Sequence, residues 1–201
     1  PTPTWLPGFT PSLTPTATGT LIPTTTATAT PTPTSTPVED LPVLISEVLY
    51  DPLGDDPGGE WIELYHHGDT SVDLSGFRLG DEETYAGGEG MLVFPVGALI
   101  QPGQTMVVAN RAVLFQAVYE FVPQFEIIDS DPSVPEMDRD SLWASGSVNL
   151  SKDGDEVLLI SPGGIWLDAV SWGSATTAFS PSVQPVLEGS SIERYPPGQD
   201  S

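Results

Sequence analysis

Beyond residue 40 the chain alternates short apolar runs with clusters of Gly, Pro and Asp, a pattern typical of β-strands joined by tight turns. The first run, Val43–Tyr50, is apolar on both faces apart from Ser46 and Glu47, which predicts a strand covered on both sides. The second, Glu60–Tyr65, alternates and places two aliphatic side chains on one face. Further strands are expected at Val72–Leu74, Phe77–Leu79, Met91–Phe94, Thr105–Ala109, Val148–Leu150, Glu156–Ile160 and Trp166–Trp172.

One segment interrupts this β pattern. Asn110 is a candidate cap for a short helix at Arg111–Glu120, in which Leu114, Ala117 and Val118 share one face. We therefore expect one helix, packed through that apolar face.

Turn-forming residues separate the strands. Lys152-Asp-Gly154 and Pro162-Gly-Gly164 predict hairpin turns, and Ser75-Gly76 predicts a turn or bulge. The longest connection is an acidic, Pro-containing loop at Phe121–Ser141. Many short strands with one helical excursion predict an all-β fold, either a β-sandwich or a barrel.

The N-terminal segment has a different composition. Its first 37 residues are almost entirely Thr, Pro, Ala and Ser, and the first charged residue is Glu39. Such a segment cannot bury enough apolar surface to offset its ordering entropy, so we expect residues 1–40 to be disordered and extended. The composition suits a stalk that holds a domain away from a surface and equally a linker between domains. Residues 41–201 are then expected to form one folded domain.

The charge balance limits the classes of molecule that could bind this chain. The 201-residue chain carries 28 Asp and Glu against 5 Lys and Arg, for a formal net charge of -23. Nucleic acid and anionic lipid are poor partners for such a field, whereas cations, basic proteins and uncharged glycans fit it. The absence of Cys excludes thiolate metal sites and thiol catalysis. No apolar run approaches the ~20 residues of a membrane-spanning helix, so we expect no direct membrane insertion.

Five segments carry a family resemblance through their order and spacing. They are Leu44-Ile-Ser-Glu-Val-Leu-Tyr-Asp51, Glu60-Trp-Ile-Glu-Leu-Tyr65, Val72-Asp-Leu-Ser-Gly-Phe77, Asp168-Ala-Val-Ser-Trp-Gly173 and Ser191-Ile-Glu-Arg-Tyr-Pro196. Together they resemble the lamin-tail domain, an immunoglobulin-like module of nuclear lamins and of many bacterial surface and secreted proteins.

The resemblance implies an immunoglobulin-like sandwich of seven to nine strands, with roles in binding and assembly and no catalysis. It also implies that the domain can be an accessory to hydrolases or nucleases elsewhere in a chain. Two segments depart from the bacterial pattern: His66-His67, where Asn and a small residue are common, and the loop Phe121–Leu142, which is poorly matched.

Candidate catalytic residues are few. The only histidines, His66 and His67, are adjacent in a predicted turn, and no Gly-x-Ser-x-Gly elbow is present. We interpret both as residues of a surface turn whose hydrogen-bonding groups are satisfied, with weak transition-metal binding as the alternative. Asp168 falls in register with Trp166 and Trp172, which makes it the one acid expected to be partly buried. We expect its carboxylate to accept backbone N–H bonds near a strand edge or turn.

Calcium is the one metal that the sequence suggests, because Ca²⁺ takes carboxylate and carbonyl oxygens from loops. One loop offers Asp51, Asp55 and Asp56; the other offers Asp129, Asp131, Glu136, Asp138 and Asp140. The weak Ca²⁺ candidates are Asp129, Asp131, Asp138 and Asp140. Neither loop has the spacing of an EF-hand, and a solvated acidic loop is the alternative for both. No other cofactor is expected.

The tryptophans have two interpretations. Trp61, Trp143, Trp166 and Trp172 are candidates for an aromatic platform that binds sugars or a partner's apolar patch, but packing in the sandwich is favoured for most of them. Trp5 lies in the Thr/Pro-rich segment and is expected to be exposed. Asn149-Leu-Ser151 fits the N-glycosylation pattern at a predicted strand end.

These observations favour a non-catalytic binding or structural module of a secreted or cell-surface bacterial protein, displayed on a Thr/Pro-rich stalk. Its partner would be a protein or a cell-envelope glycan. The alternative is an accessory domain of a larger secreted hydrolase or nuclease whose catalytic domain lies outside this sequence. We expect no enzymatic activity from the chain itself.

Overall fold

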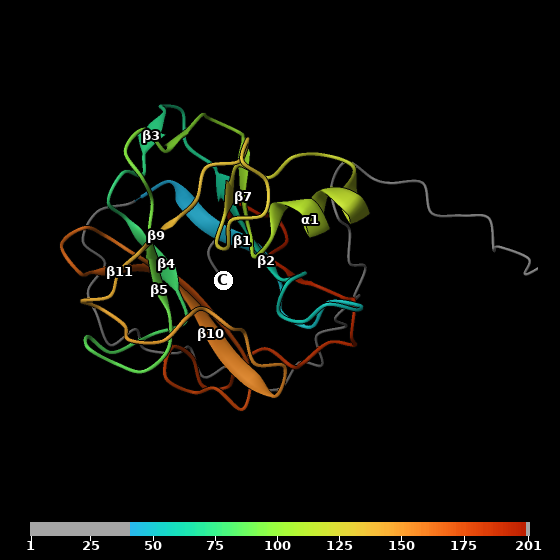
Figure 1. The fold of residues 1–201 in the computed structure, drawn as a ribbon. Helices are drawn as coiled ribbons and strands as arrows, with labels where there is room; N and C mark the ends of the chain where they lie inside the picture. Colours follow the sequence, from blue (N-terminus) through green and yellow to red (C-terminus); the bar gives the residue numbers. More distant parts are fainter. Residues whose placement is uncertain (1–40, 200–201) are drawn as a thin grey trace, which may run out of the picture.

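The computed structural model describes residues 41–199, in which two five-stranded β-sheets stack into an immunoglobulin-like sandwich (Figure 1). Residues 1–40, where the Thr/Pro-rich stalk or linker and Trp5 are expected, lie outside the described residues, as do residues 200–201. The expected domain boundary near residue 40 therefore stays a prediction.

The first sheet has the strand order β12-β1-β2-β7-β8. Its strands are β12 (Ile192–Glu193), β1 (Val43–Leu49), β2 (Trp61–His66), β7 (Thr105–Ala109) and β8 (Phe125–Glu126). All of these pairings are antiparallel except that of β7 with β8, which is parallel.

The second sheet has the order β11-β10-β4-β5-β9, with every pair antiparallel. Its strands are β11 (Trp166–Gly173), β10 (Gly154–Ile160), β4 (Arg78–Gly80), β5 (Met91–Val93) and β9 (Asp138–Arg139). A separate pair joins β3 (Val72–Asp73) to β6 (Leu99–Ile100). Residues 41–199 thus contain 12 strands rather than seven to nine, because short two-residue pairings at the margins add to the longer strands.

The core lies between the two sheets and is closed by aromatic and aliphatic side chains. Tyr50 and Trp172 stack with ring centroids 4.4 Å apart, next to fully buried Leu64, Leu79 and Leu159. All seven residues of β1 are buried, which confirms the prediction of a strand covered on both sides.

The outer faces of both sheets are also covered. Helix α1 (Ala112–Tyr119) packs Phe115 and Tyr119 edge-on against Trp61, on the outside of the first sheet. The second sheet is covered outside by a cluster that contains Trp143, Met91 and Leu158. This covering explains why polar positions that look solvent-facing in the sequence are buried.

The helix was predicted in the right place but with the wrong cap and the wrong packing face. Its N-cap is Arg111, which makes no side-chain cap bond, rather than Asn110. The buried helix residues are Ala112 and Phe115. Val118, expected on the packing face, is exposed, because the sequence is apolar on both sides of the helix and the larger aromatic rings take the sheet.

The predicted long loop Phe121–Ser141 is also partly wrong, because it contributes both β8 and β9. Glu126 in β8 explains the missing helix cap. Its Oε2 atom accepts the backbone N–H of Ala112 at 3.0 Å, and the Ser130 hydroxyl accepts that of Val113 at 3.2 Å. The first backbone N–H groups of a helix have no acceptor within the helix, and here a later segment of the chain supplies the acceptors.

Candidate functional site

Three carboxylates meet at one end of the sandwich, from the residue before β2 (Glu60), the residue after β4 (Asp81) and the start of β10 (Asp155). We call these three residues the carboxylate clasp. Their oxygens accept three consecutive backbone N–H groups: Asp81 Oδ2 from Asn149 at 2.9 Å, Glu60 Oε1 from Leu150 at 3.1 Å and Asp155 Oδ2 from Ser151 at 2.6 Å. The strand predicted at Val148–Leu150 is wrong for this reason: the N–H groups of Asn149 and Leu150 bond to side chains and not to a neighbouring strand.

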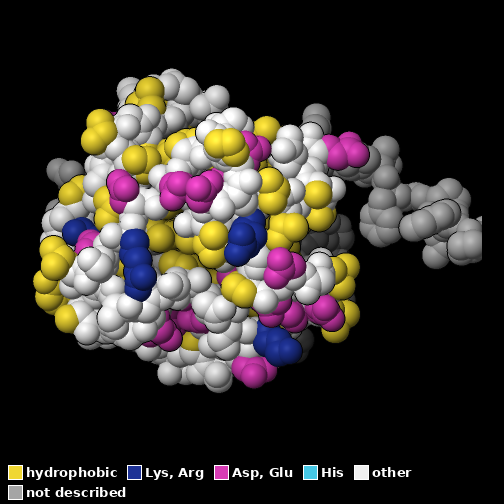
Figure 2. All heavy atoms as spheres, in the orientation of Figure 1, with side chains coloured by type: hydrophobic (Ala, Val, Ile, Leu, Met, Phe, Trp, Pro, Cys, Tyr) yellow, Lys and Arg dark blue, Asp and Glu magenta, His cyan; other side chains and the backbone are white. Residues whose placement is uncertain are grey.

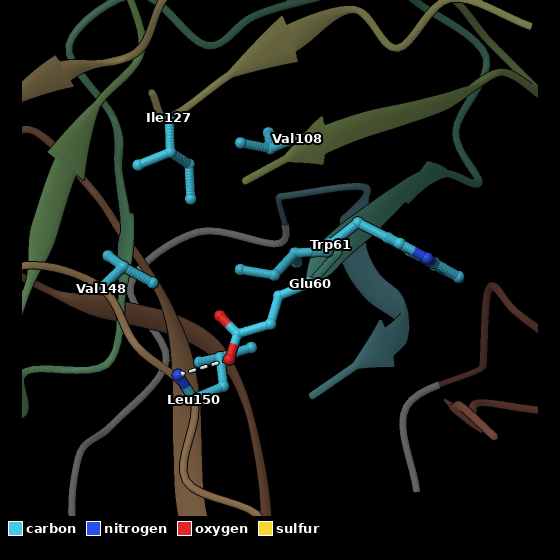
Figure 3. Close-up of a pocket in the computed structure, with 7 residues that line it drawn as sticks. Glu60, Trp61, Val108, Ile127, Val148 and Leu150 are labelled. Atoms are coloured by element: carbon cyan, nitrogen blue, oxygen red, sulfur yellow. Dashed lines mark hydrogen bonds between the residues drawn. The ribbon is translucent and has the colours of Figure 1, made fainter. Parts of the chain in front are cut away.

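Glu60 also lines a small internal space between the two sheets (Figure 3). In Figure 3 its carboxyl group turns toward Leu150, and Val108, Ile127 and Val148 surround the same space. The space has no room for a water molecule. The second carboxyl oxygen of Glu60, Oε2, is buried and has no hydrogen-bond partner among the described residues. The clasp therefore serves to hold the backbone at this end and does not form a substrate cleft.

The acids at this end retain protons to unusually high pH. Burial raises the pKa of Glu60 to about 9, against the lowering effect of the Leu150 N–H and with further raising by Asp56. Burial likewise raises the pKa of Asp81 and of Asp155 to about 6 each. The pKa of neighbouring Glu89 rises to about 7 through burial and the charges of Asp155 and Asp81.

A second group of carboxylates crosses the outer face of the first sheet. Glu47 lies directly opposite Glu193 of β12 on one side and Glu63 of β2 on the other. Glu47 is 2% exposed and Glu63 is 6% exposed. We call these three residues the carboxylate row.

The expectation that Asp168 is the one partly buried acid is wrong. Many other acids are buried as well: Glu47, Glu60, Glu63, Asp81, Glu82, Glu126, Asp155 and Glu156. In the sequence these acids look like ordinary solvent-facing positions, because nothing local shows that a helix or a loop covers them. A signal was present in four of them, since predicted strands contain Glu47, Glu60, Glu63 and Glu156.

The expected role of Asp168 itself is confirmed. Its Oδ2 atom accepts the backbone N–H of Ile45 at 2.7 Å, which ties β11 of one sheet to β1 of the other. Its Oδ1 atom also forms a salt bridge with the Arg194 guanidinium at 3.0 Å, and Arg194 Nε donates to the carbonyl of Ile45. Sequence reasoning missed Arg194 because it lies 26 residues further along the chain.

Two of the calcium candidates are bonded to neighbouring residues, and the other two are exposed. Asp140 accepts the Arg78 Nε–H at 2.7 Å, and Asp131 accepts the hydroxyl and backbone N–H of Ser133. Asp129 and Asp138 are exposed, the latter in β9. Within residues 41–199 no three His, Cys, Asp or Glu side chains are grouped so that they could hold a metal ion. Calcium binding stays a prediction.

His66 is fully buried at the end of β2, so the expectation of a surface position is wrong for it, whereas His67 is exposed. The His66 ring is satisfied, as expected. Its Nδ1 atom accepts the Gly68 N–H at 2.9 Å, and its Nε2 atom lies 2.6 Å from the carbonyl of Thr70, which makes Nε2 the donor. The bonds hold the turn that follows β2.

The tryptophans divide between core and surface. Trp61 and Trp172 are packing residues, as favoured, while Trp143 and Trp166 belong to one cluster on the outside of the second sheet. Beside that cluster lies a surface that we call the aromatic patch, made of Arg78, Tyr85, Leu142 and Trp143. Tyr85 is 66% exposed and meets Trp143 edge-on at 5.7 Å, and Leu142 is 77% exposed.

Polar contacts fix the aromatic patch. The Trp143 indole N–H donates to the carbonyl of Glu82 at 3.1 Å, and the Arg78 guanidinium lies 5.0 Å from the centre of the Trp143 ring. Arg78 in turn forms its salt bridge with Asp140. Figure 2 shows hydrophobic side chains scattered among acidic ones over one face of the molecule. The patch thus combines exposed apolar area with a rigid base.

The lamin tail domain family model matches residues 39–174. The chain belongs to the lamin tail domain family. This confirms the resemblance drawn from the strand motifs. The C-terminal part of this lamin tail domain, including β12 and Arg194, lies beyond the matched residues.

A solved structure of a DUF4876 family protein from Bacteroides thetaiotaomicron VPI-5482 has a similar fold, with a TM-score of 0.52 at 15% sequence identity. The similarity covers 70% of this lamin tail domain chain and 56% of that protein, so the chain matches little more than half of its neighbour's length. A search of curated proteins finds no match. Within residues 41–199 no helix has both the length and the hydropathy needed to cross a bilayer.

Proposed function

We propose that this lamin tail domain is a non-catalytic binding module of a secreted or cell-surface bacterial protein, with residues 1–40 as its Thr/Pro-rich stalk or linker. The partner is a protein or an uncharged cell-envelope glycan. The family supports a role in binding and assembly, and the composition of residues 1–40 supports display away from a surface.

The aromatic patch is the observation that carries this proposal. Trp, Tyr and Arg are the residues that dominate the energy of protein interfaces. Here a hydrogen bond holds Trp143 and a partly buried salt bridge holds Arg78, while Tyr85 and Leu142 present apolar area to solvent. A partner that docks on such a prearranged surface loses little conformational entropy on binding.

The carboxylates support a structural role at the same time. In the clasp their oxygens accept backbone N–H groups, and Asp168 and Asp140 are bonded to arginines. These acids stabilise loops and sheet contacts, which leaves the exposed loops of the sandwich to make contacts with a partner.

The test is a binding screen of the full chain against arrays of cell-envelope glycans and envelope proteins. We expect Tyr85→Ala and Leu142→Ser each to lower the affinity for the bound ligand by about tenfold or more, because both remove exposed apolar area at the patch. Leu187→Ser is the matched control, since Leu187 is 83% exposed on the segment before β12. Equal binding by the patch variants and the unaltered chain would reject the patch as the contact surface.

A further inference from the structure

The C-terminal strand β12 is a two-residue strand at the edge of the first sheet. It pairs only with β1, at Glu47 with Glu193 and at Val48 with Ile192. One more backbone bond follows, from Arg194 N–H to the carbonyl of Ser46 at 2.8 Å. The Arg194–Asp168 salt bridge, the bond from Arg194 Nε to the carbonyl of Ile45, the hydrogen bond from the Ser191 hydroxyl to Glu47 and the burial of Ile192 add to the attachment.

The carboxylate row lies at this attachment, because Glu193 of β12 faces Glu47 and Glu47 faces Glu63. Residues directly opposite on neighbouring antiparallel strands have Cβ atoms about 4.5–5.5 Å apart, and like charges at that spacing repel. Three ionised carboxylates in such a row would therefore oppose the pairing of β12 with β1.

The groups that face the row are neutral or acidic. Ser191 donates to Glu47 from the β12 side, and Ser46 donates to Glu63 at 2.7 Å from β1. Thr105 of β7 also bonds to Glu63. From helix α1, the Tyr119 hydroxyl is the titratable group that interacts with Glu47.

The cation next to the row in the sequence is bonded to other groups. Arg194 follows Glu193 directly, but its guanidinium bonds to Asp168 and to the carbonyl of Ile45. Both salt bridges between described residues lie elsewhere than the row. The charge of the carboxylate row therefore depends on how many of its own carboxyl groups are protonated.

We propose that the carboxylate row is a proton-operated latch: β12 stays paired with β1 while the row keeps a proton on Glu47, and it detaches as that proton is lost.

The direction follows from the environment of Glu47. Burial, and then the charges of Glu63 and Glu193, raise the pKa of Glu47 to about 8 in the paired state, although the Ser191 hydroxyl lowers it. Detachment removes Glu193 and exposes Glu47 to water, which returns its pKa toward the ordinary 4.5. The paired state thus binds the proton more tightly, and its advantage is lost as the pH rises from about 5 through about 8.

Release would uncover a row of backbone groups on β1. Val48 and Glu47 would lose their partner strand, and Ser46 would lose the Arg194 N–H. An uncovered strand edge is a template for another extended segment, so the latch controls access to the edge of the first sheet.

Hydrogen exchange of the full chain, corrected for the intrinsic rate at each pH, tests the latch. We expect the backbone N–H of Arg194 to lose at least about tenfold more protection between pH 5 and pH 9 than the core N–H groups of β10, which report unfolding of the whole domain. Glu47→Gln cannot ionise and keeps the Ser191 acceptor, so its Arg194 N–H should stay protected at both pH values.

Glu188→Gln is the matched control, because it removes one carboxylate from the loop before β12 without touching the row. It should behave as the unaltered chain does. Three results would overturn the latch: constant protection of Arg194 in the unaltered chain, an equal loss in Glu47→Gln, or a loss at Arg194 no greater than that in β10.

Discussion

Most buried carboxylates of this domain are balanced by backbone N–H groups rather than by cations. With 28 acids and 5 Lys and Arg in the chain, cations are too few to pair with every buried acid. The clasp residues Glu60, Asp81 and Asp155 accept peptide N–H groups, whereas Asp168 and Asp140 have arginine partners. A carboxylate held by N–H groups fixes a loop without needing a partner of opposite charge.

Asp168 gives the clearest test at the scale of one residue. Asp168→Ala removes the acceptor of the Ile45 N–H and the carboxylate that pairs with the largely buried Arg194 guanidinium, so we expect a loss of about 3–5 kcal/mol in the free energy of unfolding. Asp168→Asn keeps an acceptor and should cost less. Urea denaturation measures both.

Asp69→Ala serves as the control for Asp168, since Asp69 is exposed and its removal should change stability by less than about 0.5 kcal/mol. An Asp168→Ala variant as stable as Asp69→Ala would show that the link between the two sheets does not contribute to folding.

At the scale of elements, the sequence predicted those strands whose apolar pattern is long enough to be read locally. Thr105–Ala109 was predicted residue for residue as β7, and Pro162-Gly-Gly164 does join β10 to β11. Two of the failures share one cause. Val148–Leu150 and β8 depend on partners far away in the sequence, namely the clasp carboxylates and a parallel strand, and no local period reports such partners.

The same limit applies to the candidate site. Asp168 was found because it shares the register of a predicted strand, but its partner Arg194 was not. Tyr85 gave no signal, because an isolated aromatic residue in a loop looks the same in the sequence whether it is exposed or packed. The aromatic patch needs β4 and the loop after β9 to be brought together, which only the fold does.

Two loops approach each other closely beside the clasp, and Gly90 is required there. A Cβ atom at Gly90 would overlap the backbone nitrogen of Val148. We expect Gly90→Ala to lower the free energy of unfolding by about 1–3 kcal/mol, because backbone atoms cannot move aside as a flexible side chain can.

Gly88→Ala is the matched control, since a Cβ atom there would meet nothing within 4 Å. Its stability should change by less than about 1 kcal/mol. Thermal unfolding of the two variants side by side gives the comparison, and equal stability would mean that the loops can separate at no cost.

At the scale of the whole molecule, the raised carboxyl pKa values set the dependence of stability on pH. For Glu60 (about 9), Glu89 (about 7), Asp81 and Asp155 (about 6 each), the folded pKa exceeds the ordinary 4.5 or 3.8. The stability that they contribute is fully present below the ordinary pKa and is lost as the pH rises through the folded values.

We therefore expect the melting temperature to be higher at pH 5 than at pH 9, at constant ionic strength. Asp140 acts in the opposite sense at low pH: burial would raise its pKa, but the Arg78 hydrogen bond holds it below 3.8, so its contribution is lost only in stronger acid. The optimum should fall at about pH 5.

Glu60→Gln should flatten the pH dependence of the melting temperature, whereas Glu188→Gln should leave its slope unchanged, because Glu188 is an exposed side chain in the loop before β12. A melting temperature that rises steadily from pH 5 to pH 9 would contradict this account of the buried acids.

The antiparallel register of β1 with β12 has a mechanical consequence. Residues before Val43 and residues after Glu193 leave the sheet at the same end, because the two strands run in opposite directions side by side. A pulling force between the two ends of the domain would load their hydrogen bonds one after another, as a zipper opens, and not all at once as in shear. Under tension the last strand would peel away first, while the two sheets behind it remain intact.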